Sequence, residues 1–485
     1  MTDETRVPVL IGAGQSIERD ATVSALDLAE RAAGAALDDA GGIEGAIDRV
    51  SVVNMLSRVG PAPATDLAAR LGIAGATCEA TVVGGNTPQA LVNRAAVDIS
   101  AGRISGTLIA GAEAMRSART GEKVPSGGKA DEADPVLGQD RLGVGESEMS
   151  VGLLVPAHIY AMVDSAVAHR EGRTGAEHRK ALGDLMAPFT EVAAKHPWAW
   201  FPEPLNAASI AEVTEANRVV AEPYTKKMCA FLNVDQGAAV IVSSLAAARA
   251  AGLADQAVFV AAGADAVDVW EPTARPDIAA SPAIAAAAGG VMDAAGLAID
   301  EIELLDLYSC FPAAVQLAAE AIGIHPATTD RQLTLTGGLP YFGGPGNNYS
   351  THAIATAAGL LREGASNALI GALGWYVTKH SYGLYTSAPP ASGYAAVDLA
   401  GEQKAIDESA RTIVGPGEDI DTPGIVVAAT QGTDRDGNTT SAPVIADLPD
   451  GRRAVAAAAD PASAPVDIVG RAVHLRGQTW SEVNR

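Results

Sequence analysis

Apolar and polar residues along the chain repeat with two periods, and segments of the two kinds alternate. Apolar runs at residues 7–11, 50–55 and 77–83 have the length of buried strands. Between the first two runs, residues 24–37 place apolar side chains at helical spacing. Strands that alternate with helices in this way are typical of an α/β fold.

One arrangement of elements occurs twice, and the rest of the chain is organised around it. In the segment 332–376, an alternating β pattern leads into a glycine-rich loop, then into an apolar helix at about residues 350–361 and a second strand. Far upstream, residues 77–112 contain a strand, the pair Gly84 and Gly85, a helix and another strand. This repeat predicts an internal duplication.

The two glycine loops are the first candidate site. Glycines at strand ends let the backbone approach a ligand closely, and a helix that starts just beyond them offers free N–H groups to an anion. Equivalent strand ends in an open α/β sheet lie on the same side, so the two loops predict one shared cleft. The alternative, that the glycines only permit tight turns, stays open. The residues expected to line the cleft are Gly84, Gly85, Asn86, Gly343, Gly344 and Gly346.

Several segments resemble a known family. The segment TLIAGAEAMRSA, the strand NVDQGAAVIVSS from Asn233 to Ser244, and the order of the duplicated elements resemble the thiolase superfamily, especially its sterol-carrier-type branch, over roughly Arg6 to Pro390. The resemblance implies two βαβαβ halves with stacked mixed sheets, an inserted lid, and CoA or acyl-CoA as the ligand. It further implies an acetyl-CoA acetyltransferase-like protein of lipid metabolism that requires no cofactor.

The C-terminal region has a different texture. A stretch rich in Pro and Ser at residues 387–393 predicts a linker, and short apolar runs follow it. Two Asp-Gly steps, at residues 436–437 and 450–451, predict hairpins in a small antiparallel, barrel-like β domain. The predicted units are the N-terminal half (1–116 and 223–245), the inserted lid (117–222), the C-terminal half (246–390) and the β domain (391–485).

The chain departs from thiolases at each of their four catalytic motifs. By resemblance, Gly84 stands where thiolases have a nucleophilic cysteine, and Tyr308 stands where an HDCF-like segment has its histidine. The GHP-like segment at residues 343–345 lacks its histidine, and the CxG segment at residues 372–374 lacks its cysteine. Thiolysis and condensation need a nucleophile and an acid/base group, so we expect no ordinary thiolase activity.

Three other residues are weaker catalytic candidates. The Tyr308 hydroxyl is suited to donate to a thioester carbonyl. Cys310, at the start of a helix, is a candidate for a lowered thiol pKa, and His380 is a candidate for a polar contact in the cleft. Ordinary packing is the competing interpretation for all three. Any remaining chemistry would be acyl transfer on acyl-CoA thioesters, or retro-aldol cleavage, from these relocated positions.

Composition narrows the classes of partner. The formal net charge of −24 repels nucleic-acid phosphates and anionic membranes, and no apolar run approaches the ~20 residues that span a bilayer. The three cysteines are widely spaced and form no CxxC motif, and the histidines lack a metal-ligand pattern, so no metal is expected. Without a basic, apolar signal segment, we expect a soluble cytoplasmic protein.

Assembly has two possible forms. The thiolase dimer, by resemblance, uses the strand before the first glycine loop. Here that strand contains Glu79, and a charge on an exposed edge disfavours strand pairing, so a monomer and a dimer both stay open.

The alternative function is that of a non-catalytic partner or regulatory subunit, which would dock on another acyl-CoA enzyme through the C-terminal β domain.

Overall fold

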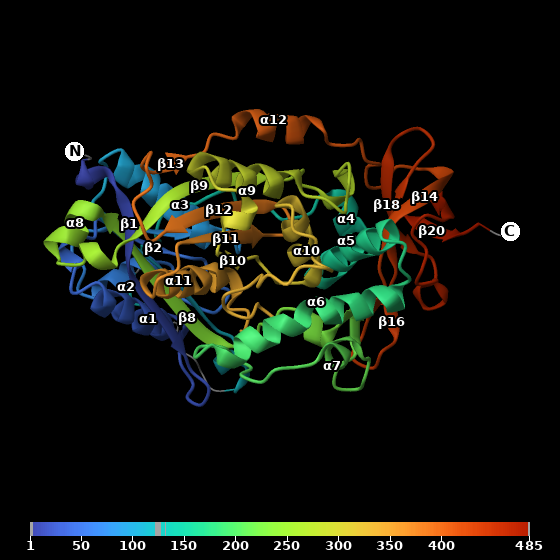
Figure 1. The fold of residues 1–485 in the computed structure, drawn as a ribbon. Helices are drawn as coiled ribbons and strands as arrows, with labels where there is room; N and C mark the ends of the chain where they lie inside the picture. The colour runs from blue at the N-terminus through green and yellow to red at the C-terminus, as the bar shows by residue number, and fades with distance from the viewer. Residues whose placement is uncertain (1–2, 122–127, 131, 484–485) are drawn as a thin grey trace.

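The computed structural model describes residues 3–121, 128–130 and 132–483 of the chain. Within these ranges eleven strands form one mixed sheet, in the order β10-β11-β12-β9-β1-β8-β4-β2-β3-β5, with β13 beside β9 (Figure 1). The strands on the N-terminal side are β1 (Pro8–Ile17), β2 (Arg49–Val52), β3 (Thr77–Thr81), β4 (Gly106–Ala114), β5 (Val136–Leu137) and β8 (Asp235–Ser244). Those on the C-terminal side are β9 (Val258–Val267), β10 (Leu304–Asp306), β11 (Asn367–Gly374), β12 (Lys379–Thr386) and β13 (Ala395–Ala396).

The two halves of the sheet are joined by the short pairing of β1 with β9. Strands β1 and β9 pair at only two positions, Val9 with Phe259 and Leu10 with Val258. Two helices, α3 (Thr87–Ser100) and α11 (Tyr349–Arg362), pack between the halves in one apolar cluster that takes side chains from β8, β9 and β11. The predicted duplicated α/β architecture with stacked sheets is therefore confirmed.

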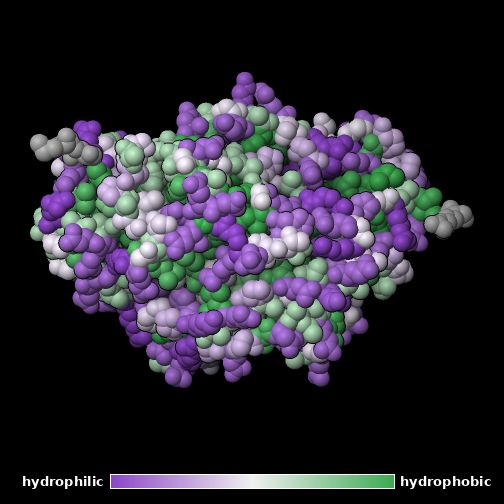
Figure 2. Space-filling view, viewed as in Figure 1, coloured by the Kyte–Doolittle hydropathy of each residue, from purple (hydrophilic) through white to green (hydrophobic). Residues whose placement is uncertain are grey.

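The outer faces of the sheet are covered by further helices. The N-terminal half buries α1 and α2, whereas the C-terminal half packs against α9, α10 and the inserted region. On the face drawn in Figure 2, hydrophilic residues are interspersed with hydrophobic ones. No helix of the described residues combines the length and apolarity needed to cross a membrane. The outer helices are α1 (Ala25–Asp39), α2 (Pro63–Arg70), α8 (Leu245–Ala250), α9 (Pro282–Ala295) and α10 (Pro312–Ala321).

The strand predicted at residues 332–336 is not formed. The buried carboxylate of Asp306 accepts hydrogen bonds from the backbone N–H of Leu335 at 2.7 Å and from the hydroxyl of Thr334 at 3.1 Å. A side chain therefore takes the place of a neighbouring strand. The helix that follows the glycine loop, α11, begins within one residue of its predicted start.

The C-terminal region is a closed barrel at the end of the molecule opposite the N-terminus (Figure 1). The barrel confirms the predicted β domain, although its β18–β20 pair is parallel. Of the two predicted Asp-Gly hairpins, the one at residues 450–451 joins two barrel strands, whereas the one at residues 436–437 lies in a separate sheet. Helix α12 (Ala400–Glu408), which precedes the barrel, was not predicted. The barrel strands are β14 (Asp421–Ala429), β17 (Pro443–Asp447), β18 (Arg453–Ala458), β19 (Ala472–Arg476) and β20 (Thr479–Glu482).

The inserted region joins the barrel region in a second, four-stranded sheet of order β16-β15-β6-β7. Its strands are β6 (Val219–Ala221), β7 (Tyr224–Thr225), β15 (Gly432–Thr433) and β16 (Thr439–Ser441). The helices of the insert are α4 (Glu146–Ser150), α5 (Pro156–Arg170), α6 (Gly175–Lys195) and α7 (Ala207–Ala211). Two segments that lie about 200 residues apart are thus hydrogen-bonded to each other.

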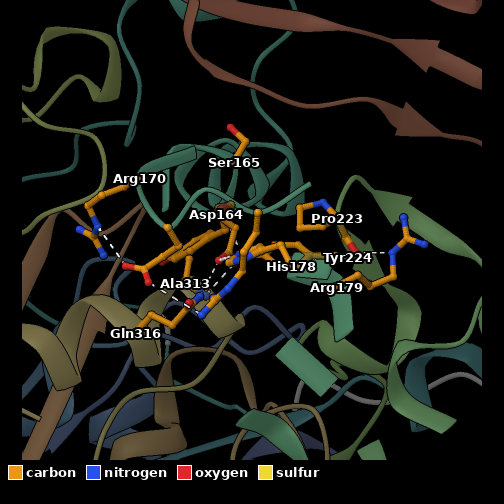
Figure 3. Close-up of polar contacts among 12 residues, drawn as sticks. Asp164, Ser165, Arg170, His178, Arg179, Pro223, Tyr224, Ala313 and Gln316 are labelled. Atoms are coloured by element: carbon orange, nitrogen blue, oxygen red, sulfur yellow. Dashed lines mark hydrogen bonds and ion pairs between the residues drawn. The ribbon is translucent and has the colours of Figure 1, made fainter. Parts of the chain in front are cut away.

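A buried carboxylate ties the insert to the C-terminal half. Asp164 of α5 accepts hydrogen bonds from Gln316 of α10 at 2.5 Å, from the Tyr224 hydroxyl, and from His178 Nε2 of α6 at 2.8 Å. Figure 3 shows these side chains converging from their separate elements. Asp164 and His178 are fully buried, so the loss of one of these hydrogen bonds would leave a desolvated polar group with fewer partners.

We expect Asp164→Leu to lower the free energy of unfolding by about 3–5 kcal/mol, because it removes the acceptor of the buried His178 and Gln316 donors, whereas the Tyr224 hydroxyl keeps the Tyr160 carbonyl. Urea denaturation followed by fluorescence measures the change. The matched control is Asp184→Leu, at an exposed position of α6, which should shift the midpoint little. Equal midpoints for the two variants would contradict the role given to Asp164.

The edge of the sheet at β3 is covered by the chain itself. Strand β5 pairs with β3 in parallel, Ala80 opposite Val136 and Thr81 opposite Leu137. Glu79 is not an exposed edge charge, contrary to the sequence-based argument: its buried carboxylate lies 2.6 Å from Arg94 and accepts a hydrogen bond from Ser51 at 2.6 Å. Protection of this edge therefore comes from β5 rather than from the charge of Glu79.

Because β5 occupies the edge that the thiolase dimer would use, we expect the protein to be a monomer in solution. Multi-angle light scattering over a hundredfold range of protein concentration tests this. A dimer mass that persists on dilution would show that the covered edge does not set the oligomeric state.

Candidate functional site

The first glycine loop connects β3 to α3 and is held by residues of the second loop. The backbone N–H of Gly84 donates to Asn347 Oδ1 at 2.9 Å, and the Ser350 hydroxyl donates to the carbonyl of Gly85 at 3.2 Å. Asn347 also donates to the carbonyl of Asn54 at 3.0 Å. The structure thus brings the two loops into direct contact at the start of α11.

A lysine side chain fills the space beside Gly84. Lys379, the first residue of β12, donates from Nζ to the carbonyl of Val83 at 2.7 Å. A Cβ atom placed on Gly84 would lie 2.6 Å from Lys379 Nζ and 2.6 Å from Asn86 Oδ1. No side chain fits at position 84 while the lysine holds this position.

The surroundings of Lys379 lower the pKa of its ammonium group. Burial lowers the pKa of Lys379 to about 8, because a buried ammonium loses hydration. No carboxylate forms an ion pair with Lys379 in the part of the chain that the structure describes. Lys379 is thus a partly buried cation with one backbone acceptor.

A cavity of about 310 Å³ opens beside this loop. Asn86 is oriented at its wall by Ser381, which accepts from Asn86 Nδ2 at 3.3 Å and donates to Asp265 at 2.5 Å. Asn86 Oδ1 is buried and has no hydrogen-bond partner among the residues that the structure describes. The polar and aromatic residues that line the cavity include Asn86, Arg94, Gln139, Trp270 and Lys379.

The glycines of the second loop pack against protein atoms. A Cβ atom on Gly343 would lie 2.4 Å from Gln236 Oε1, and one on Gly346 would lie 2.3 Å from Glu113 Oε1. At Gly344 the nearest atoms, from Leu232 and Phe231, lie 3.3 Å away. The loops meet through Asn347, and binding of one ligand by both sets of glycines stays a prediction. No group of three or more His, Cys, Asp or Glu residues suited to a metal ion occurs among the described residues.

Solved structures of known proteins share this fold. A monomeric SCP2-thiolase-like protein type 1 from Mycobacterium smegmatis is 31% identical, with a TM-score of 0.86 and full coverage of both chains. This chain belongs to the thiolase superfamily. The Ltp2-ChsH2(DUF35) aldolase (20% identity, TM-score 0.62, 79% of this chain and 98% of that chain) and an acetyl-CoA acetyltransferase from Syntrophomonas wolfei (17%, 0.58, 79% and 99%) share the fold. A scan of protein-family models and a search of curated proteins found no match.

Tyr308 lies on the other side of the first glycine loop, next to Gly85. A Cβ atom on Gly85 would lie 2.2 Å from the Tyr308 hydroxyl, so this glycine makes room for the phenol. The ring packs edge-on against Tyr349 at 5.5 Å between centroids. Burial raises the pKa of Tyr308 well above its ordinary value, which keeps the hydroxyl protonated and able to donate.

The prediction of a lowered thiol pKa at Cys310 is wrong. Burial raises the pKa of Cys310 to about 12, and this effect exceeds the hydrogen bond from Tyr160 that acts in the opposite direction. Helix α10 begins only at Pro312, and the thiol lies in the apolar core that surrounds α9 and α10. Cys310 is therefore a neutral thiol at physiological pH.

His380 faces away from the first glycine loop. Its Nε2 lies 3.1 Å from the buried carboxylate of Asp268, on the side of β12 that packs against α9. Successive strand residues point to opposite faces, so Lys379 and Ser381 face the loop instead. The sequence argument missed Lys379 by one position. A lysine within an apolar strand pair was the signal available.

We expect Lys379→Met to change the pH dependence of stability. The folded-state pKa of Lys379 (about 8) lies below its unfolded value near 10.5, so the unfolded chain binds more protons between these values. The unfolding free energy of the wild type should therefore rise relative to Lys379→Met as pH increases from 8 toward 10. Denaturation at pH 7 and pH 9.5 measures this. Lys404→Met, at an exposed position of α12, is the control and should show no such change.

Proposed function

We propose that this chain binds an acyl-CoA thioester beside the first glycine loop without carrying out ordinary thiolysis. The observation that carries the proposal is the Lys379 amine, which fills the space beside Gly84 where a thiolase nucleophile would project. A thiolase needs a thiol there to accept the acyl group. Here that volume belongs to an amine.

The local charge supports a thioester with an anionic carrier. The whole chain carries a net charge of −24, which disfavours the approach of an anion. The cavity wall carries two basic side chains: Lys379, which has no carboxylate partner among the described residues, and Arg94, which is paired with Glu79 at 2.6 Å. A nearby helix start, that of α3, adds its partial positive charge.

Loss of the nucleophile predicts that the purified protein will not cleave acetoacetyl-CoA with CoA above the uncatalysed background. Loss of absorbance of the magnesium enolate of acetoacetyl-CoA measures thiolysis. A robust rate that Cys310→Ala abolishes would overturn the proposal, because it would assign the nucleophile to the buried thiol.

Filling the cavity should weaken ligand binding. Ala90 lies on the cavity wall, and Ala90→Phe places a ring in the space that the acyl group would occupy. We expect at least tenfold weaker binding of acetyl-CoA by isothermal titration calorimetry. Ala101→Phe, at the exposed end of the same helix, should leave the affinity unchanged. A folded Ala90→Phe variant that binds as tightly as the wild type would place the ligand elsewhere.

Calorimetry with CoA and several acyl-CoAs also separates this proposal from its rival. A chain that binds none of them would act as a non-catalytic partner of another acyl-CoA enzyme, with the barrel as its docking module. A chain that binds them uses the thiolase site for a ligand.

A further inference from the structure

Lys379 has the surroundings of a reactive amine. An ammonium group withdrawn from water is strongly destabilised unless a carboxylate compensates it. Lys379 is partly buried, and its one hydrogen bond among the described residues goes to a neutral backbone carbonyl, that of Val83. A site without a counter-ion increases the fraction of neutral amine, which is the nucleophilic form of lysine.

The charged groups around the cavity are engaged elsewhere. Arg94 lies 2.6 Å from the carboxylate of Glu79 on β3. Asp265 of β9 accepts the hydroxyl proton of Ser381 at 2.5 Å and a hydrogen bond from Asn93 at 3.3 Å. None of these groups is bonded to the amine, so its protonation is governed by burial.

The geometry leaves one side of the amine available. One N–H is fixed on Val83, and the Lys379 side chain forms part of the wall of the cavity. Asn86, whose Oδ1 has no hydrogen-bond partner among the described residues, also lines the cavity, and its amide is held through Ser381 and Asp265. An unpartnered acceptor and an amine on the wall of one 310 Å³ cavity suit a ligand with an electrophilic carbonyl carbon for Lys379, because addition of the amine creates a hydroxyl that can donate to Asn86.

We propose that Lys379 forms an imine with the keto carbonyl of a 3-oxoacyl compound bound in this cavity. The neutral amine adds to the ketone carbon, a C–N bond forms, and an amine proton moves to the oxygen to give a carbinolamine. Asn86 Oδ1 accepts a hydrogen bond from the new hydroxyl. Loss of that hydroxyl with the second amine proton releases one water and leaves the C=N bond, with no change of oxidation state.

The ketone, rather than the thioester, is the chemically suitable electrophile. Attack on a thioester carbon would expel the CoA thiolate and leave Lys379 permanently acylated, as an amide. Addition to a ketone is reversible, and water regenerates the amine. The inference rests on the proposed function only for the CoA carrier, and not for the reactivity of the amine.

Reductive trapping tests the proposal. The protein is incubated at pH 7.5 with sodium cyanoborohydride and either acetoacetyl-CoA or butanone, an uncharged ketone, and the modified lysines are mapped by mass spectrometry. With a pKa of about 8, about a quarter of Lys379 is neutral at this pH, against roughly one in a thousand for an exposed lysine. We expect Lys379 to be labelled at least tenfold faster than Lys404, whose side chain is 75% exposed.

Two variants assign the labelling to the cavity. Ala90→Phe should slow labelling of Lys379 at least tenfold and leave Lys404 unchanged, whereas Ala101→Phe should change neither. Labelling of Lys379 no faster than of Lys404 with butanone would overturn the proposal. An unreduced acyl adduct on Lys379 with release of CoA would overturn the assignment to the ketone.

The two arms separate this inference from the proposed function. Labelling by butanone but not by acetoacetyl-CoA would support the reactive amine and refute the CoA carrier. Binding of acyl-CoA by calorimetry, with neither probe labelling Lys379, would leave the proposed function standing and refute the amine. Labelling by both probes would support both.

Discussion

The structure depends on two helices that are buried between the two halves of one sheet. Helices α3 and α11 share an apolar cluster with strands of both halves, and small residues such as Ala95, Ala96, Ala357 and Ala358 let the layers approach closely. Because both helices start from glycine loops, their packing brings those loops together. The contact between Gly84 and Asn347, which lie 263 residues apart, follows from this layer.

Position 84 and position 379 form a matched pair. Gly84 supplies the volume and Lys379 fills it, so a cysteine at position 84 is incompatible with the lysine in its observed place. The glycine and the lysine therefore depend on each other in this arrangement. Burial lowers the pKa of the amine that occupies this space.

The elements were predictable from the sequence, whereas the facing of single side chains was not. Helical periods indicated α3 and α11, and the Asp-Gly steps indicated the β15–β16 and β17–β18 hairpins, because these signals are local. The strand expected at 332–336 failed because a distant carboxylate, Asp306, takes its hydrogen bonds.

The candidate site was less predictable because its contacts are long-range. Choosing between Lys379 and His380 requires the register of β12 against β9. Adjacent strand residues point to opposite faces of the sheet, so a shift of one residue changes which of the two faces the glycine loop. The thiol pKa of Cys310 depends on burial by the insert and the C-terminal half, which no local motif records.

The segment that covers the sheet edge also builds the site. Leu137 pairs with Thr81 of β3, and it lines the cavity together with Gly138 and Gln139. In a fold where this edge is open to a second subunit, a partner would face this region. Here the same few residues close the edge and complete the cavity wall. Edge protection and ligand site are therefore coupled, and a change that displaced β5 would expose the strand and open the cavity together.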